Sequence, residues 1–307
     1  MSAGGGTKAI VAALVANAGI ATAKFVGFLI TGSSSMLAES VHSVADTSNQ
    51  GLLLLGQKTA QRRATRLHPF GYGRDRYFWS FVVALLLFSL GSVFALYEGI
   101  HKLQHPEGLT SPLVAVGILV VAIGLETYSF ITAINESKKI KGDASWWGFI
   151  RNSRTPELPV VLLEDLGALV GLVLALFGVG LTMITGNPMF DALGTVCIGV
   201  LLGVIAIILI IEMKSLLIGE GAPDKDLDVI CDELAAGKVQ RVIHIKTQYI
   251  GPEELLVAAK IALEPQLSLD EVAQAINDAE QRVRNKVPHA RLIYLEPDLD
   301  RSTVASS

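Results

Sequence analysis

Long apolar stretches fill the first two thirds of the chain. Five of them approach or exceed the ~20 residues that a helix needs to cross the hydrocarbon core of a bilayer, and they lie at 10–30, 78–97, 113–132, 158–184 and 194–217. A sixth stretch, 35–56, is less hydrophobic because polar and charged residues interrupt it. Counting it as a helix leaves no apolar segment stranded in a long loop. The pattern over 1–217 therefore predicts an α-helical membrane domain of six transmembrane helices.

From about residue 218 the pattern becomes that of a small water-soluble domain. It indicates helices over 224–236 and 269–287 and strands over 239–249, 255–263 and 291–296. Ser268 precedes the second helix and Glu271 follows three residues later, which is the spacing of a capping box. The order helix, strand, strand, helix, strand predicts an α+β domain over 218–300, and 301–307 is expected to be a flexible C-terminus.

Composition agrees with a membrane domain and excludes several classes of protein. The chain is 51% hydrophobic and 18% charged, with a mean hydropathy of +0.49, whereas soluble domains carry about 25% charged residues. A wholly soluble enzyme is therefore excluded. The pI of about 5.9 and the lack of a basic stretch interleaved with aromatic residues also exclude a nucleic-acid-binding protein.

Positive charge is concentrated in two of the predicted loops. The loop after the second span holds Lys58, Arg62, Arg63, Arg66, Arg74 and Arg76, and the loop after the fourth holds Lys138, Lys139, Lys141, Arg151 and Arg154. Cytoplasmic loops of membrane proteins carry an excess of Lys and Arg. We therefore expect a multi-pass protein of a bacterial cell membrane, with both termini and the α+β domain in the cytoplasm.

Ionisable residues inside transmembrane helices are costly and mark functional sites. The less hydrophobic stretch 35–56, the second span along the chain, contains four polar residues: Glu39, His42, Asp46 and Asn49. They are separated by three, four and three residues, which places them on one face of a helix. An imidazole and a carboxylate at positions i and i+4 can both reach one metal ion. We expect this face to point into the bundle, with His42 and Asp46 as ligands of a divalent cation and Glu39 and Asn49 as accessory groups.

Two adjacent carboxyl groups, Glu164 and Asp165, lie in a predicted span that contains no basic residue. Buried carboxylates cannot both stay charged without a cation beside them. Successive helical residues are about 100° apart, so we expect Asp165 to point at His42 and Asp46 and Glu164 to be an accessory ligand or proton acceptor. The alternative is that such groups only hydrogen-bond helices to one another. For Lys24, pairing with an acid and extension to the membrane surface are both open.

Further motifs are spread along the chain. They are TGSSSMLAESVHSVAD at 31–46, HPFGYGR at 68–74, EGIHKL at 98–103, Asp191 at the start of the sixth span, and His244 in VIHIKT. Together with the six spans they resemble the cation diffusion facilitator family over about residues 8–298. The stretch 39–50, with Glu164 and Asp165, is most similar to a divergent branch of that family, the branch of zinc transporter nine.

The resemblance implies a homodimeric transporter that exports a divalent metal, typically zinc, in exchange for protons. It also implies two ligands from the second span and two from the fifth, each pair at i and i+4. In this sequence these would be His42 and Asp46 with Asp165 and position 161. The last is Val161, where zinc-transporting members usually have His or Asp, so Glu164 is the candidate to replace the missing ligand.

The resemblance further implies that the α+β domain serves dimerisation. Many members bind zinc there, but this domain has only two histidines, His244 and His289. Because a zinc site usually has about four ligands, we do not expect one in this domain.

The sequence thus predicts a secondary antiporter with a metal ion and protons as substrates. Zinc is transported cargo, so no cofactor is expected, and the partners are the lipid bilayer and a second copy of the chain, without nucleic acid. One alternative is an intramembrane metalloenzyme, although no H-E-x-x-H or G-x-S-x-G motif occurs. The others are a metal sensor without transport, and a transporter selective for manganese, iron or cobalt.

Overall fold

The computed structural model describes residues 3–106, 108–109 and 111–299, with side chains described from residue 17 onward. The chain divides into two compact units. The first contains Met1–Thr59 and Asp75–Lys214, and the second contains Ala60–Arg74 and Ser215–Ser307. The basic loop 60–74 thus groups with the C-terminal unit, which its sequence did not indicate. The expected flexible segment 301–307 lies outside the described residues.

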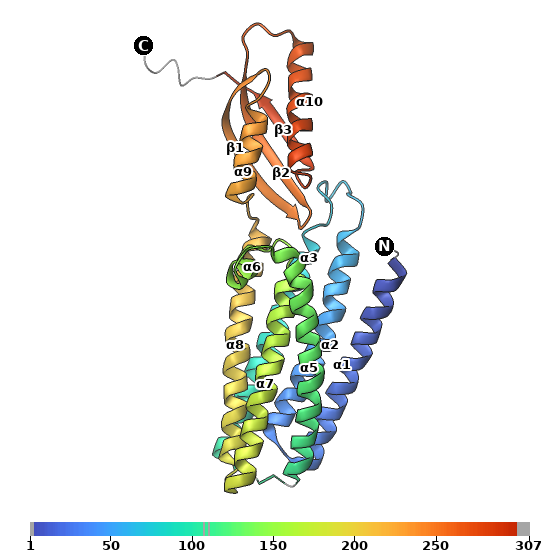
Figure 1. Cartoon of the computed structure of the whole chain (residues 1–307), viewed down its shortest axis with the longest axis vertical. Helices are drawn as coiled ribbons and strands as arrows, with labels where there is room; N and C mark the ends of the chain where they lie inside the picture. The colour runs from blue at the N-terminus through green and yellow to red at the C-terminus, as the bar shows by residue number, and fades with distance from the viewer. Residues whose placement is uncertain (1–2, 107, 110, 300–307) are drawn as a thin grey trace, which may run out of the picture. The chain divides into compact units, whose positions relative to one another are not determined.

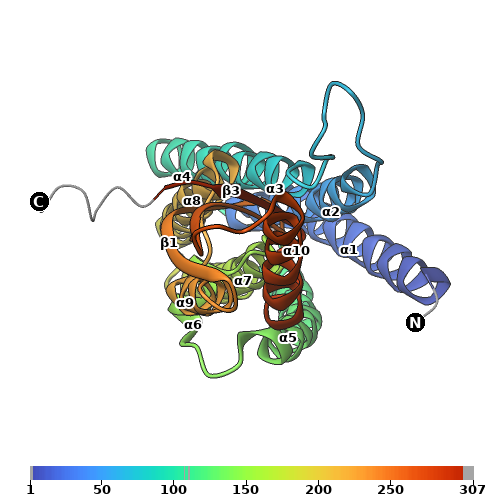
Figure 2. The same ribbon diagram turned by 90° about the horizontal axis from the view of Figure 1, so that it is seen from above.

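Six long helical segments form the first unit and correspond to the six predicted spans (Figure 1). They are α1 (Ala3–Thr31), α2 (Ser34–Ala60), a third segment made of α3 (Asp75–Leu86), η1 (Leu87–Val93) and α4 (Phe94–Gln104), α5 (Pro112–Lys141), α7 (Glu157–Thr185) and α8 (Met189–Ile218). A short helix, α6 (Trp146–Asn152), lies in the second basic loop, where no element was predicted. Figure 2, which looks along the helices, places α7 between α5 and α8.

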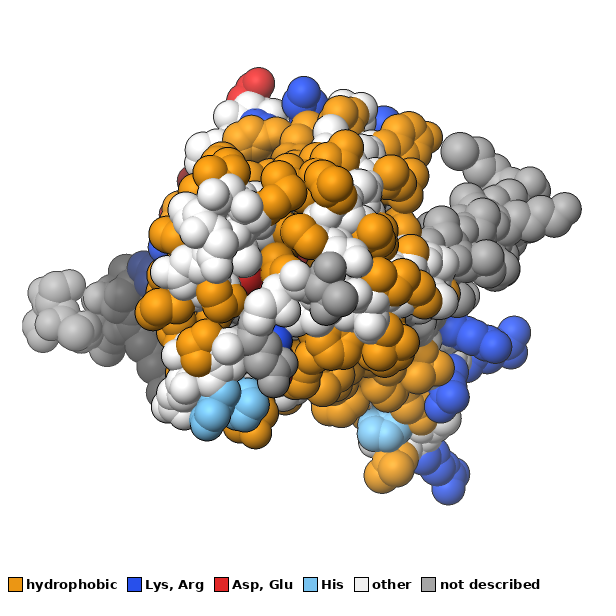
Figure 3. All heavy atoms as spheres, turned by 90° about the horizontal axis from the view of Figure 1, so that it is seen from below, with side chains coloured by type: hydrophobic (Ala, Val, Ile, Leu, Met, Phe, Trp, Pro, Cys, Tyr) orange, Lys and Arg blue, Asp and Glu red, His pale blue; other side chains and the backbone are white. Residues whose placement is uncertain are grey.

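Four of these segments are long and apolar enough to cross a membrane. They are Asp75–Gln104, Pro112–Lys141, Glu157–Thr185 and Met189–Ile218. In α1 the described part, Asn17–Thr31, is apolar but shorter, and α2 is the polar helix that the sequence predicted. Large apolar side chains are exposed on the outer surfaces of the helices, and hydrophobic side chains cover much of the face in Figure 3. The chain is a multi-pass integral membrane protein with a helical transmembrane domain.

The third span is interrupted by one stretch of π-helix, η1, that its uniformly apolar sequence did not predict. Gly91 lies in this stretch, where a Cβ atom would meet Leu202 of α8 at 3.2 Å and His42 Nδ1 of α2 at 3.8 Å. The missing side chain lets the third span approach α2 and α8 together. π-helical turns are frequently found at functional sites. The position of η1 beside His42 therefore favours a functional role for that residue.

The N-terminus of α2 is held by the first turn of α8. The Asp191 carboxylate accepts hydrogen bonds from Ser33 Oγ at 2.8 Å, from the backbone N–H of Ser34 at 2.9 Å and from Ser34 Oγ at 3.0 Å. A carboxylate beside the free N–H groups of a helix N-terminus is favourable. These contacts fix the end of α2 that precedes the Glu39–Asn49 face.

The second unit has the predicted α+β order. It consists of α9 (Asp224–Leu234), β1 (Val239–Gly251), β2 (Glu254–Leu263), α10 (Leu269–Lys286) and β3 (Leu292–Pro297). The sheet order is β1-β2-β3, with β1 antiparallel and β3 parallel to β2. Both helices contribute to one core, in which Ile230, Val257 and Val283 are buried. The second face of the sheet carries polar side chains.

The predicted capping box of α10 is present. Ser268 Oγ accepts a hydrogen bond from the Glu271 backbone N–H, and the Glu271 carboxylate accepts one from the Ser268 backbone N–H at 2.9 Å. These bonds, with the Lys238 ammonium at 3.0 Å, lower the pKa of Glu271 to about 2. Because the folded pKa is depressed, the stabilisation by Glu271 is complete above pH ~4.5, the ordinary range of the group, and is lost as the pH falls toward 2.

We expect Ser268→Ala to destabilise the first turn of α10. Loss of an N-cap side chain costs about 1 kcal/mol, so the backbone amides of this turn should exchange hydrogen roughly fivefold faster at pH 7, since 1.4 kcal/mol corresponds to about tenfold. The measurement is hydrogen exchange followed by mass spectrometry on the full chain in detergent. Gln281→Ala, more than three turns later on the same helix, is the control. Equal exchange in the two variants would contradict the assignment of the cap.

Candidate metal site

The polar face of α2 points into the helical bundle. His42 and Asn49 are wholly buried, and the side chain of Asp46 is 14% exposed. His42 Nε2 lies 3.6 Å from Asp46 Oδ2, as their spacing of four residues allows. The predicted orientation of this face is therefore confirmed, and the imidazole and carboxylate lie next to each other.

The carboxyl group that faces α2 from α7 is that of Glu164. Its Oε1 accepts a hydrogen bond from Asn49 Nδ2, and its carboxyl group is within hydrogen-bonding reach of Asp46. Only 5% of Glu164 is exposed. The polar faces of α2 and α7 thus meet at Asp46, Asn49 and Glu164, with His42 one turn away.

The expectation that Asp165 points at His42 and Asp46 is wrong in this structure. Asp165 lies about 100° around α7 from Glu164 and accepts a hydrogen bond from Ser129 Oγ of α5 at 3.0 Å. Val161, one turn earlier, is on the same face, which packs toward α1 and α5. The face of α7 that lacks a ligand at position 161 is therefore not the face that meets α2.

A signal for the orientation of α7 was present in the sequence but was not used. Glu164 lies on one helical stripe with Gly167, Gly171, Ala175 and Gly178, and all five are buried. Small residues mark the faces on which transmembrane helices pack closely. A stripe of this kind places Glu164, and not Asp165, in the tightly packed interface.

Several polar atoms of this region make no hydrogen bond to any residue that the structure describes. They are both ring nitrogens of His42, Asp46 Oδ1, Asn49 Oδ1 and Glu39 Oε1. Buried polar atoms in proteins are nearly always paired. A group of unpaired oxygen and nitrogen atoms with free electron pairs is therefore suited to bind a cation. Among the described residues, however, no three His, Cys, Asp or Glu side chains converge closely enough to hold a metal ion as they stand. The arrangement supplies adjacent ligands but not a closed ligand set.

Glu39, predicted as an accessory group, is paired with a cation. Lys24 Nζ of α1 lies 3.1 Å from Glu39 Oε2 and donates a hydrogen bond to Ser43 Oγ at 2.8 Å. Lys24 and Glu39 are both wholly buried. Of the two alternatives that the sequence left open for Lys24, the structure shows pairing with an acid.

Asp165 opens onto a cavity of about 780 Å³ between α1, α5 and α7. Ser129 and Val161 line it near Asp165, Asn17 lines it from α1, and Glu136 and Glu157 line it near the ends of α5 and α7. Sequence reasoning missed Ser129, because a serine in a transmembrane helix is commonly only an interhelical contact. The cavity is lined mainly by apolar side chains, and it connects the few polar groups near the helix ends with Asp165.

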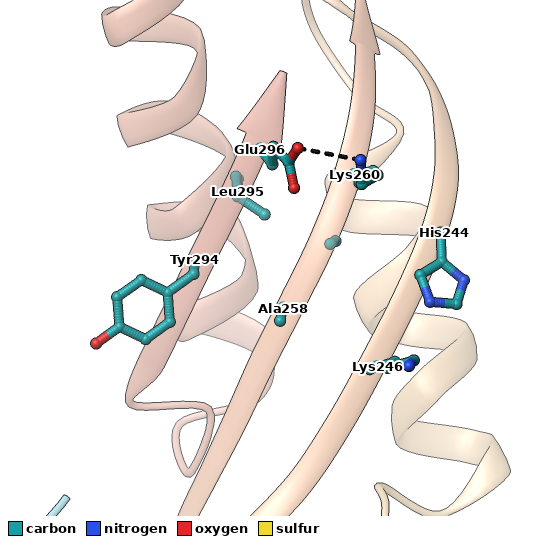
Figure 4. A pocket seen from close by; sticks show the side chains of 8 residues that line it. His244, Lys246, Ala258, Lys260, Tyr294, Leu295 and Glu296 are labelled. Carbon is teal, nitrogen blue, oxygen red and sulfur yellow. Dashed lines mark ion pairs between the residues drawn. The ribbon is translucent and has the colours of Figure 1, made fainter. Parts of the chain in front are cut away.

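The exposed face of the C-terminal sheet carries a separate hollow of about 290 Å³, shown in Figure 4. His244 lies on this face, and Lys260 Nζ is 3.0 Å from Glu296 Oε1 and 3.1 Å from Asp298 Oδ2. The carboxylates raise the pKa of Lys260, with Glu296 as the main cause. His289 is elsewhere, with Nε2 3.2 Å from Asp226 Oδ2. The two histidines are thus on different parts of the domain. The carboxylates nearest the hollow, those of Glu296 and Asp298, are paired with the Lys260 ammonium group.

Residues 10–218 match the family model of the cation efflux transmembrane domain. This match covers most of the chain, including every residue of the candidate site. The chain belongs to the cation diffusion facilitator family. The resemblance seen in the sequence is confirmed, and because members of this family are transporters, the intramembrane metalloenzyme is the wrong alternative.

Individual relatives from the family extend over most of this chain. It is 35% identical over 242 residues to a Mus musculus protein named proton-coupled zinc antiporter SLC30A9, mitochondrial, covering 78% of this chain and 42% of that protein. It is 32% identical to metal tolerance protein C4 of Arabidopsis thaliana (85% and 58%) and 25% identical to magnetosome protein MamB of Magnetospirillum gryphiswaldense (87% and 85%). The chain therefore spans about half the length of the first two relatives. The bacterial membrane and the cytoplasmic termini remain predictions.

The orientation of α7 leads to a test with Val161→His. Since Val161 and Asp165 share the face that borders the cavity, the new imidazole should lie beside Asp165 and away from His42 and Asp46, so zinc affinity should stay within about threefold of the parent. The measurement is titration calorimetry of the purified protein in detergent. The matched control is Leu166→His, at a partly exposed position of α7 that shares a face with neither Asp165 nor Glu164. Unchanged stoichiometry with tighter binding would show instead that Val161 faces His42 and Asp46.

Proposed function

We propose that this protein exchanges a divalent metal cation, zinc, for protons across a membrane, through a site between α2 and α7. The observation that carries the proposal is that Asp46 lies between His42 of its own helix and Glu164 of α7 inside the bundle, with nitrogen and oxygen atoms that make no hydrogen bond to the described residues. Packing alone is a poor explanation for this arrangement, since ionisable groups in membrane helices are costly and mark ion pathways.

The chemistry of these side chains suits zinc. Imidazole nitrogen and carboxylate oxygen are both common zinc ligands, whereas a soft ion such as Cu(I) would require sulfur. Metal ligands must be deprotonated, so metal binding releases protons and proton binding releases metal. A site that is exposed to one side and then to the other can thereby exchange the two ions. The name of the mouse relative, a proton-coupled zinc antiporter, supports this assignment.

Four residues are assigned as ligands, in two positions along one route. His42, Asp46 and Glu164 form the central position, where Asn49 orients the Glu164 carboxylate. Asp165 forms a second position in the cavity, where it receives the cation before transfer to the centre. Of the two neighbouring carboxylates of α7, Asp165 thus faces the cavity and Glu164 faces the central position of the same path.

The remaining assignments follow from the family and the sequence. We propose that the protein functions as a homodimer, with the α+β domain in the cytoplasm. Three of the four central groups, Asp46, Asn49 and Glu164, offer oxygen atoms, which manganese also accepts. Transport of manganese, iron or cobalt is therefore the alternative that a competition experiment must address.

Removal of one central carboxylate should abolish zinc transport. In Asp46→Ala and Glu164→Gln a desolvated anion is lost, and we expect zinc affinity to fall by about tenfold or more, because breaking a buried charge interaction costs several kcal/mol. The measurement is zinc uptake into proteoliposomes driven by a pH gradient, with manganese, iron and cobalt as competitors. Glu212→Gln, which removes a carboxyl group of α8 that interacts with Arg151, is the control. Parent-like transport by both variants would refute the site.

The two positions should differ in kinetics. Asp165→Asn retains the central ligands, so we expect equilibrium zinc affinity within about threefold of the parent, a difference below 1 kcal/mol. The maximal transport rate should fall, because the cation loses its first anionic contact in the cavity. Calorimetry and initial uptake rates measure the two quantities separately. If Asp165→Asn loses affinity as severely as Glu164→Gln, Asp165 belongs to the central position.

A further inference from the structure

Lys24 is a cation at the centre of the bundle for which the proposed transport reaction has no use. It is wholly buried in α1, and its ammonium group contacts Glu39 and Ser43, which are one turn apart on α2. An isolated buried charge is strongly unfavourable, and pairing with hydrogen bonds offsets that penalty. A neutral side chain would connect the two helices without the penalty, so the charge itself calls for an explanation.

The pair lies next to the proposed metal ligands. Ser43 follows His42 directly, and Glu39 precedes His42 by three residues, so the Glu39 carboxylate is on the same face of α2. The charge of Lys24 interacts with His42 and with Asp46 as well as with Glu39. A rotation of its side chain would bring the Glu39 carboxylate toward His42, one turn along α2.

The pocket that holds Glu39 is shaped for a carboxylate in its present position. A Cβ atom on Gly171 of α7 would lie only 2.5 Å from Glu39 Oε1. That oxygen is buried and makes no hydrogen bond to the described residues, while the other oxygen binds Lys24. Within the described part of the chain, Lys24 thus binds one oxygen of this carboxylate, and the missing side chain at Gly171 leaves room for the other.

We propose that Lys24 determines the metal specificity of the site by holding Glu39 out of it. This inference rests on the proposed function. With Glu39 held by Lys24, a cation meets one imidazole and two carboxylates, a set that suits zinc. With Glu39 released, the site has three carboxylates, which favour harder ions such as manganese. The number of charged ligands also sets the affinity of a cation site, so a third carboxylate slows release of the cargo.

The test compares Lys24→Met with the double variant Lys24→Met/Glu39→Gln. The single variant frees the Glu39 carboxyl group, which can lose its proton when a cation binds beside it. The double variant replaces the same ion pair by neutral groups of similar size. Binding constants for Zn²⁺ and Mn²⁺ are measured by calorimetry in detergent, and KM and maximal rate for each ion are measured in proteoliposomes. The control variant is Arg151→Gln/Glu212→Gln, which neutralises an ion pair between α6 and α8.

For Lys24→Met we expect Mn²⁺ to bind about tenfold more tightly, as an added anionic ligand predicts. Zn²⁺ should also bind more tightly, with a lower KM and a lower maximal rate. The double variant should return the Zn²⁺-over-Mn²⁺ preference to within about threefold of the parent, a difference below 1 kcal/mol. The control variant should match the parent.

Two results would overturn the inference. If the double variant binds Zn²⁺ and Mn²⁺ as tightly as the single variant does, Lys24 acts by direct repulsion of the cargo and not through Glu39. If neither variant changes the metal preference, the pair only connects α1 to α2. In both cases the parent still binds and transports zinc, whereas a parent that transports no divalent ion would refute the proposed function itself.

Folding can be separated from specificity by a third variant. Lys24→Gln is neutral, but its amide can still donate a hydrogen bond to Glu39 or Ser43. Where Lys24→Met does not yield a monodisperse protein, Lys24→Gln takes its place. The same direction of change in the Mn²⁺ affinity is expected, and a parent-like preference in Lys24→Gln would count against the inference.

Discussion

The cost of placing charge in a low-dielectric interior is the constraint on which this structure depends. Four ionisable contacts show how the bundle meets this cost: Lys24 lies beside Glu39, His42 beside Asp46, Glu164 beside Asn49, and Asp165 beside Ser129. These contacts connect α1, α2, α5 and α7. The helices are therefore positioned by their polar faces as well as by apolar packing, which provides little preference between helices surrounded by lipid.

The two neighbouring carboxylates of α7 have different surroundings. Because adjacent residues on a helix point about 100° apart, α7 presents Glu164 to α2 and Asp165 to α1 and α5. One helix thereby borders both a compact centre and a cavity that reaches the helix ends. The small-residue stripe of α7 determines which of the two carboxylates takes the central position, since Gly167 and Gly171 require close packing on that face.

Sequence reasoning was most successful where periodicity carries information. The polar face of α2 follows from the spacing of Glu39, His42 and Asp46, and the α+β order of the C-terminal unit follows from its alternating patterns. The rotational orientation of α7 was missed because the helix carries apolar side chains on all of its faces, so hydrophobicity alone does not distinguish them. The π-helical turn was missed for a related reason, since an inserted residue in an apolar helix leaves no mark on the pattern.

The contact between Asp191 and the start of α2 restricts the motions by which the proposed site could open to either side of a membrane. Three hydrogen bonds tie the serines before and within the first turn of α2 to α8, so sliding of α2 along α8 at this end would break them together. A rocking motion about that end is compatible with all three. In the proposed transport cycle the Asp191 cluster would then be the pivot, and displacement of the His42 and Asp46 side chains would grow with their distance from it along α2.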